Sequence, residues 1–333
     1  MPIHRRGIWA ETAPPEVLCD PATWTLLARY ALEVAVAVRP GDVALAARVR
    51  DLAAQAEVKA LLWPMIDDAE GRWLSVVSAR AFRTFLTEVR SAAPELGIVL
   101  DLEPPLSMVR GVLDRRRRAL RELFSLVRGS AAHEEGERLI VEMCNEIRAQ
   151  GVPLTLALVP FVLWDGVEPG WAGLFGPTVP LPATRVNAML YSTLIAGYSK
   201  GLLSMNDARA VVADGCMRTL DRFGEAAAVS LGAVGIGALG DEPVYTSPAE
   251  LSHDVALAAA CGVTDVWLFD LGGVLQRDTP ERWLKVFTDE PAAVAKTPST
   301  FRSAVVSRCL AAGARALSFG RKRSRRGEKI AEL

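Results

Sequence analysis

Hydrophobic and polar positions along this chain alternate between short apolar runs and longer stretches with the spacing of amphipathic helices. Eight of the apolar runs are rich in Val, Ile, Leu and Ala, and most of them end at charged residues, Gly or Pro. Strands of this kind, separated by helices, are typical of a parallel sheet that is covered on both faces. The runs lie at residues 7–11, 32–39, 58–66, 97–103, 153–164, 186–195, 227–238 and 264–271.

Eight strand–helix units in succession predict an α/β protein that closes into a (β/α)8 barrel, the TIM-barrel fold. We expect this barrel to occupy residues 1–290 as a single domain. An open, doubly wound sheet is the main alternative, but no Gly-x-Gly-x-x-Gly follows the first run, as its simplest dinucleotide-binding form requires. Residues 291–333 are predicted to form a helix at 301–317 and then a disordered tail with the basic run 321–326.

Composition and charge exclude several classes of protein. The chain holds 38 Lys and Arg against 39 Asp and Glu, and 50% of its residues are hydrophobic, which argues against a disordered chain and against a nucleic-acid partner. No run reaches the ~20 apolar residues of a membrane-spanning helix. The N-terminus lacks the apolar segment of a signal peptide, so we expect a cytoplasmic protein. Five widely spaced cysteines predict no disulfide framework, and the oligomeric state stays open.

Candidate functional residues lie where the predicted strands end, because barrels of this kind carry their active sites at the carboxyl ends of the strands. Carboxylates hydrogen-bond sugar hydroxyls and transfer protons, and indole rings stack on the apolar faces of pyranose rings. The set therefore indicates a saccharide ligand rather than a phosphate or a nucleotide. It consists of Glu11, Arg39, Trp63, Asp67, Asp101, Glu103, Trp164, Asp165, Tyr191, Trp267 and Asp270.

Two carboxylates in the fourth run are the strongest candidates for catalysis. Asp101 and Glu103 point to the same face, since side chains of a strand alternate between faces. Two carboxylates within reach of each other split their pKa values, so that one can stay protonated at neutral pH and act as a general acid. The alternative is that Asp101 caps a neighbouring loop and that Glu103 pairs with Arg39 or with another cation.

The fourth run resembles the catalytic strand of family 18 glycoside hydrolases, the chitinase-like barrels. That strand has the approximate pattern Asp-Gly-x-Asp-x-Asp-x-Glu, and Gly97, Asp101 and Glu103 match it. Leu96 and Val99 stand where the family has its two upstream acids. The resemblance covers the barrel in outline, roughly residues 7–290.

The sixth and eighth runs extend this resemblance. The family has Met-x-Tyr-Asp on its sixth strand, and this chain has Met189 and Tyr191 at the matching positions, followed by Ser192 in place of the Asp. The family also places a Trp under the reacting sugar from its eighth strand, and Trp267 is the corresponding residue here.

The resemblance implies hydrolysis of a glycosidic bond in an N-acetylhexosamine saccharide, with no cofactor. Glu103 would be the general acid and then the base, and Asp101 would orient the acetamido group that acts as nucleophile. Tyr191 would hydrogen-bond the same group, and Trp267 would form the sugar platform. If a protein carboxylate is the nucleophile instead, its distance from Glu103 sets the stereochemical outcome. The candidates for that role are Glu11, Asp67, Asp165 and Asp270.

Two other functions stay open. The missing acids at Leu96, Val99 and Ser192 are compatible with a catalytically inactive, carbohydrate-binding or scaffold barrel. A metal-assisted sugar-phosphate or lyase-type enzyme would use Asp67, Asp101, Glu103 and Asp270 as ligands, and backbone at 235–240 and 272–273 for a phosphate. Histidine-ligated metal is not predicted, because none of the three histidines falls at a strand end. Trp63, Trp164 and their neighbouring acids either form sugar subsites or pack between strand and helix.

Overall fold

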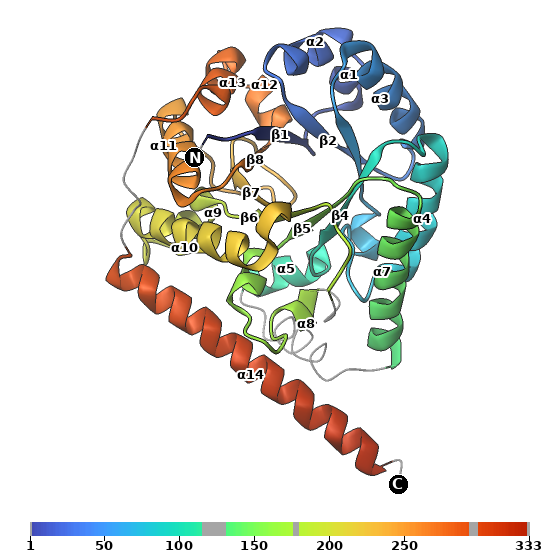
Figure 1. Ribbon diagram of the computed structural model, residues 1–333, viewed down its shortest axis with the longest axis vertical. Coiled ribbons are helices and arrows are strands. Elements are labelled where there is room, and N and C mark those ends of the chain that lie inside the picture. Colours follow the sequence, from blue (N-terminus) through green and yellow to red (C-terminus); the bar gives the residue numbers. More distant parts are fainter. Residues whose placement is uncertain (1, 115–130, 176–179, 293–298, 332–333) are drawn as a thin grey trace.

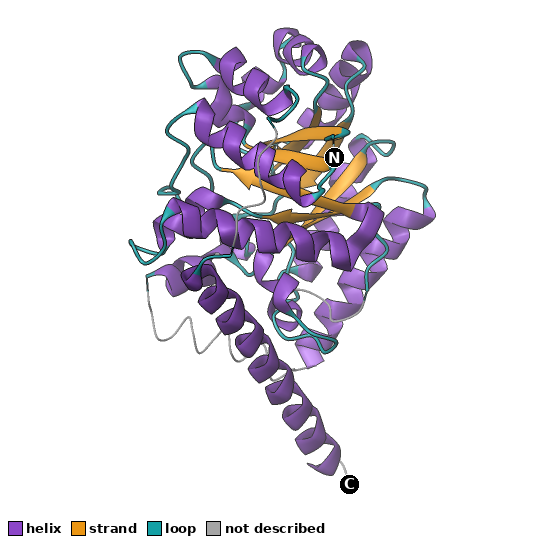
Figure 2. Ribbon diagram, turned by 60° about the vertical axis from the view of Figure 1, so that its left-hand side comes forward, coloured by secondary structure: helices purple, strands orange, loops and turns teal. Residues whose placement is uncertain are grey.

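A closed barrel of eight parallel strands forms the centre of the protein, and helices surround it (Figure 1, Figure 2). The computed structural model describes residues 2–114, 131–175, 180–292 and 299–331. Each strand pairs with its two neighbours in sequence order, and β8 pairs with β1 to close the barrel. This confirms the predicted TIM-barrel fold.

Each predicted run contains one strand, and several runs continue past the strand that they contain. The run at 153–164 divides into β5 and the short helix η2 (Pro160–Trp164), because Pro160 has no N–H for a sheet. The run at 186–195 likewise divides into β6 and α9 (Ser192–Tyr198). The strands are β1 (Arg5–Ala10), β2 (Glu33–Val38), β3 (Ala60–Pro64), β4 (Gly97–Leu102), β5 (Leu154–Leu158), β6 (Arg185–Met189), β7 (Ala227–Gly232) and β8 (Asp265–Phe269).

The helices cover the outer face of the barrel and the carboxyl ends of the strands. Asp20 caps α2 by accepting from the N–H of Ala22, with Pro21 in the first turn, and Gly262 ends α11 in a left-handed conformation. The remaining bounds are α1 (Pro15–Leu18), α2 (Pro21–Arg29), α3 (Val43–Ala56), η1 (Asp68–Glu70), α4 (Ala79–Ala92), α5 (Leu106–Leu113), α7 (Ala131–Ala149), α8 (Ala172–Phe175), α10 (Met205–Phe223), η3 (Gly224–Ala226), α11 (Pro248–Cys261), α12 (Leu271–Leu275), α13 (Pro280–Thr288) and α14 (Phe301–Ala331).

Three tryptophans fill the inside of the barrel. The ring of Trp9 contacts Trp63 and Trp267, with centroids 4.8 and 5.0 Å apart. The indole N–H of Trp9 donates to Ser230 at 2.8 Å, and that of Trp267 donates to Asp265 at 2.9 Å. The interior is therefore a packed core in which the indole N–H groups of Trp9 and Trp267 are paired, and a site can form only at the carboxyl ends of the strands.

The C-terminal helix α14 lies beside α10 and projects past the barrel (Figure 1, Figure 2). The indole N–H of Trp171 donates to the carbonyl of Leu310, and Ser307 donates to Asp214. The helix continues through the basic run 321–326, where the sequence predicts a disordered tail. Arg and Lys have high helix propensities, and no Pro interrupts this stretch.

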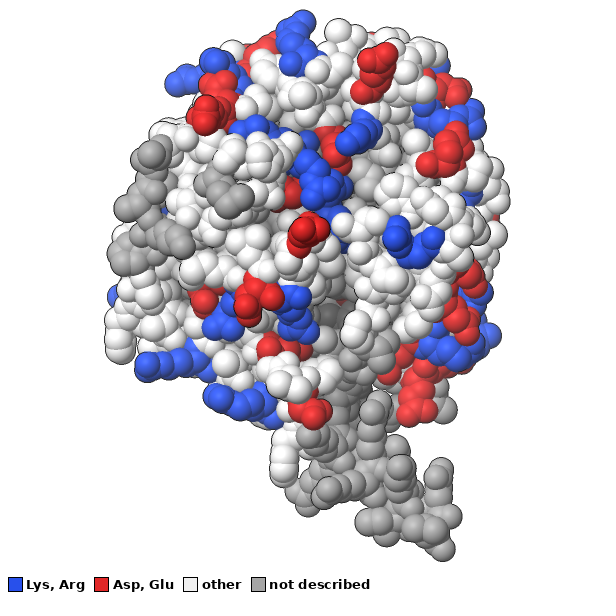
Figure 3. Space-filling view, in the orientation of Figure 1, with Lys and Arg blue, Asp and Glu red and all other residues white. Residues whose placement is uncertain are grey.

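The surface carries both signs of charge. On the face drawn in Figure 3, Lys and Arg side chains are interspersed with Asp and Glu, in line with the net charge of −1. Within the described residues, no helix combines the length and the apolar character that crossing a bilayer requires.

Gly7 makes the tryptophan packing possible, and its replacement tests this. A Cβ atom at Gly7 would lie 2.5 Å from the ring of Trp267, so we expect Gly7→Ala to destabilise the protein by roughly 2 kcal/mol or more in urea unfolding. Gly166→Ala is the matched control, since no atom lies within 4 Å of a Cβ there, and its effect should stay within about 0.5 kcal/mol. Equal effects of the two substitutions would contradict the packing argument.

Candidate active site

A cavity of about 500 Å³ opens at the carboxyl ends of the strands. Its lining comes from β1, β3 and β4 at the base, and from η2, α5, α9 and α14 further out. Three carboxylates, Glu11, Asp101 and Glu103, face it together with Tyr191. The volume of the cavity and the mainly apolar character of the rest of its lining are typical of a small-molecule site.

Asp101 is the most deeply buried of the three carboxylates. It is the fifth residue of β4, and 1% of its surface is exposed. Its Oδ1 atom has no hydrogen-bond partner among the described residues, and the indole N–H of Trp63 lies near enough to lower the pKa of Asp101. A buried polar atom without a partner is costly, which points to a ligand group as its partner.

Glu103 follows β4 directly and lies half-buried at the cavity. Burial raises its pKa to about 8, and the negative charge of Glu11 adds to the shift, while Arg72 opposes it. Burial also raises the pKa of Asp101 well above its usual value, with further contributions from Glu103 and Glu11. At neutral pH the carboxyl group of Glu103 therefore holds its proton, as a general acid must.

Glu11 differs from the other two carboxylates because arginines contact it. Its side chain is 5% exposed and accepts from Arg72 at 2.7 Å, and Arg39 lies 3.7 Å away. Arg72 also donates to Asp68 at 2.8 Å. Burial raises the pKa of Glu11, but both arginines oppose that shift. Arg39 therefore acts on the site through Glu11. It does not pair with Glu103, whereas the alternative interpretation of the sequence expected that pair.

Tyr191 and several tryptophans complete the base of the cavity. Burial raises the pKa of the Tyr191 hydroxyl well above its usual value, and Asp101 and Glu103 add to this shift, so the phenol stays neutral and able to donate. The ring of Tyr191 lies 5.7 Å from that of Phe269. Trp63 and Trp164 both line the cavity, but only 4% and 3% of their surfaces are exposed, so both rings pack mainly in the core.

Five predicted site residues do not line the cavity, and one of them is Arg39, described above. Trp267 is fully buried below Trp9, so its predicted place at the mouth is wrong: alternation along β8 gives it the inward face but in a deeper layer. Asp67 is exposed, outside the cavity, at the start of η1.

The other two are helix and loop caps. Asp270 accepts from the N–H and hydroxyl of Thr12 and from the N–H of Gly273, and thereby ties β8 to the loop after β1. Asp165 accepts from the N–H groups of Trp171 and Ala172. Backbone donors satisfy both carboxylates, which corrects their assignment as ligand-binding or nucleophilic groups.

Some residues of the site were not predicted from the sequence. Trp9 lines the cavity, and its position two residues before Glu11 on one strand is a signal that could have found it. Arg72 gave no such signal, because it lies in the loop after η1 and meets Glu11 only in the folded chain. Val306 and Leu310 of α14 also line the cavity, from a helix that the sequence places outside the barrel.

The metal- and phosphate-binding alternative finds little support in the geometry. No group of three or more His, Cys, Asp or Glu is placed to hold a metal ion in the part of the chain that the structure describes. A Cβ atom at Gly273 would lie 2.2 Å from the Cα of Gly235, and one at Gly272 would lie 2.3 Å from Thr12. These glycines therefore permit close backbone packing and do not form an open anion site.

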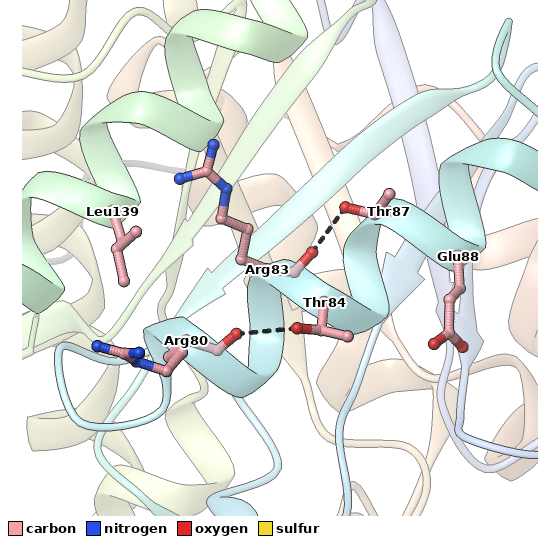
Figure 4. A pocket seen from close by; sticks show the side chains of 6 residues that line it. All are labelled: Arg80, Arg83, Thr84, Thr87, Glu88 and Leu139. Carbon is pink, nitrogen blue, oxygen red and sulfur yellow. Dashed lines mark hydrogen bonds between the residues drawn. The ribbon is translucent and has the colours of Figure 1, made fainter.

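A second hollow lies on the outer face of α4, against Leu139 of α7 (Figure 4). The hydroxyls of Thr84 and Thr87 donate to carbonyls of their own helix, as Figure 4 shows. Arg80 and Arg83, which also line it, form ion pairs with glutamates of α7. This hollow is a seam between two packed helices and holds no set of catalytic groups.

The ion pair between Glu11 and Arg72 can be tested separately from any activity. Arg72→Met leaves the buried Glu11 without its closest cation, so we expect a loss of roughly 3 kcal/mol in urea unfolding at pH 7.5. The loss should shrink as the pH is lowered, because protonation of Glu11 removes the unpaired buried charge. Adding Glu11→Gln to Arg72→Met should recover most of the stability, and equal stability of the single and double variants would contradict the pairing.

Comparisons with known proteins support the fold. A GH5-4 broad-specificity endoglucanase from an uncultured bacterium superposes with a TM-score of 0.50 at 11% identity, over 86% of this chain and 93% of that chain. ZgEngAGH5_4, in complex with a cellotriose, gives a TM-score of 0.50 at 13% identity, over 87% and 96%. A family 18 chitinase from Cycas revoluta, in complex with allosamidin, gives 0.45 at 12% identity, over 86% and 99%.

At these identities the likeness shows the barrel fold and no more. No family model and no curated protein matches the chain. Both endoglucanases thus share the barrel fold of this protein.

Proposed function

We propose that this protein is a glycoside-hydrolase-like barrel that cleaves a glycosidic bond, with Glu103 as the general acid. The observation that carries the proposal is a carboxyl group at the cavity whose pKa is raised to about 8. A group of that pKa is protonated at neutral pH and close enough to it to give up its proton in a reaction. Its place at the carboxyl end of β4 agrees with the usual location of barrel active sites.

The chemistry follows from this proton. Glu103 gives it to the glycosidic oxygen while the bond between that oxygen and the anomeric carbon breaks. The resulting carboxylate then takes a proton from the water that adds to the anomeric carbon. Tyr191, neutral and beside the carboxyl groups, offers a hydrogen bond to the sugar.

We further propose an N-acetylhexosamine as the sugar, with its own acetamido oxygen as the nucleophile. Asp165 and Asp270 are occupied as caps, and Glu11 is held by Arg72. Asp101 is a poor nucleophile because only 1% of its surface is exposed, but it can hydrogen-bond an acetamido group. A substrate that brings its own nucleophile fits this set of carboxylates best.

A second candidate is a barrel that binds a saccharide without cleaving it. One observation favours it: Ser192, at the position where family 18 carries an Asp, bonds to Asp254 in a buried cluster. Tyr245 and Arg209 also donate to that carboxylate, each at 2.7 Å. Ser192 therefore offers the cavity no group in place of the missing acid.

Replacement of Glu103 distinguishes the two candidates. We expect Glu103→Gln to lower kcat at least ~100-fold on aryl N-acetylglucosaminides and chito-oligosaccharides, because an amide cannot donate the required proton. Binding, followed by Trp fluorescence, should be retained. The parent enzyme should lose activity as pH rises through about 8, where Glu103 gives up its proton in the free enzyme.

Stability provides a readout that needs no substrate. Because the pKa of Glu103 is higher in the folded than in the unfolded protein, the folded state gains from protonation, and this gain is lost as pH rises from about 4.5 to about 8. The stability of Glu103→Gln relative to the parent should therefore increase over that range. Unaltered turnover in the variant would rule out the general-acid role, whereas binding without turnover in the parent would favour the second candidate.

A further inference from the structure

The outer half of the cavity differs in chemistry from its base. Beyond the carboxylates, the walls are apolar: aliphatic side chains come from three helices that follow different strands, and Phe161 of η2 adds an aromatic ring. The aliphatic side chains include Met108 and Val112 of α5, Ile195 of α9, and Val306 and Leu310 of α14.

The few polar groups of this outer half are already engaged. Glu242 accepts from the N–H groups of Leu239 and Gly240, at 2.7 and 2.9 Å. The hydroxyl of Tyr198 bonds to Asp241 at 3.2 Å. Further sugar units placed here would bury hydroxyls without partners, which is unfavourable, whereas an aliphatic group would lose nothing on entering.

The apolar wall lies on the side where a leaving group must be. Glu103 protonates the oxygen that joins the sugar to its aglycone, and the chain continues from Glu103 through Pro104 directly into α5. Met108, Val109 and Val112 of this helix line the cavity next to that turn. A group attached to the protonated oxygen on this side of Glu103 would meet α5 first.

Contacts with Trp171 and α10 hold helix α14, which forms another part of the wall, in position. The carbonyl of Leu310 accepts from Trp171, and Ser307 donates to Asp214 of α10 at 2.7 Å. A Cβ atom at Gly313 would lie 2.5 Å from the ring of Trp171, so helix and ring are in close contact. Val306 and Leu310 are thus part of a built surface.

We propose that the substrate is a glycoside with an aliphatic aglycone, whose sugar lies at the carboxylates and whose chain runs out between α5, α9 and α14. This inference rests on the proposed glycosidase function, since it assigns the aglycone side of that same site. The outer cavity then selects an alkyl or acyl chain, and not a second sugar, as the aglycone.

Two probes that differ only in the aglycone test it. Methyl and octyl N-acetyl-β-glucosaminide, the octyl compound below its micelle concentration, are titrated into the full chain while Trp fluorescence and release of N-acetylglucosamine are followed. We expect the octyl glycoside to bind at least ~10-fold more tightly and to have a correspondingly lower KM, because its methylene groups leave water. Equal Kd and KM values for the two probes would overturn the inference.

Neighbouring valines of α14 supply a matched pair of variants. Val306 lines the cavity, whereas Val305 is 41% exposed and does not. Val306→Asn should reduce the octyl preference at least ~3-fold, and Val305→Asn should leave it unchanged. An equal loss in both variants would assign the preference to general helix stability and overturn the inference.

The two proposals fail in different ways. Hydrolysis of both probes without a preference for octyl overturns the aliphatic aglycone and leaves the glycosidase function standing. Octyl-selective binding that Val306→Asn weakens, without release of sugar, supports the apolar outer site and overturns the hydrolysis.

Discussion

The desolvation of the carboxylates at the end of β4 is the constraint on which the site depends. Trp9, Trp63 and Trp267 fill the barrel below, so Asp101 and Glu103 rest on packed rings. Burial is the largest cause of the raised pKa of both groups. Arg72 forms its ion pair with Glu11, whereas its charge opposes the shifts of Asp101 and Glu103 without pairing with either among the described residues. One ion-paired carboxylate and two without an ion pair thus follow from where the arginines lie.

The barrel could be predicted because its strands are buried on both sides and read as apolar runs, but the strand ends could not. Loops at the carboxyl face of this protein are themselves buried under α5, α9 and α14, so apolar residues continue past the sheet. Leu163 and Trp164, for example, belong to η2 and are as buried as the strand before them. Only Pro160 marks the break, and one such signal is easily missed in a long apolar run.

The candidate site was predictable in part, for a related reason. An aspartate at a strand end has the same local sequence whether it faces a ligand or accepts from the backbone. The partner of Asp270 is Thr12, 258 positions away, so no local pattern distinguishes it from Asp101. Alternation along β8 gave Trp267 its inward face correctly but carries no information on depth. Asp101 and Glu103 could be recognised because packing does not explain two carboxylates on the same face of an otherwise apolar run.

The apolar walls and the acidity of Glu103 have a common physical origin. Aliphatic side chains around the outer cavity exclude water, and the lower local dielectric disfavours the carboxylate form of Glu103. An aliphatic aglycone that fills these walls removes the remaining water and favours the protonated acid still more strongly, whereas a small aglycone leaves the walls hydrated. The energy gained by burying the chain is therefore available for catalysis as well as for binding. In the proposed site, exclusion of water by the aliphatic aglycone therefore both selects this aglycone and keeps Glu103 protonated.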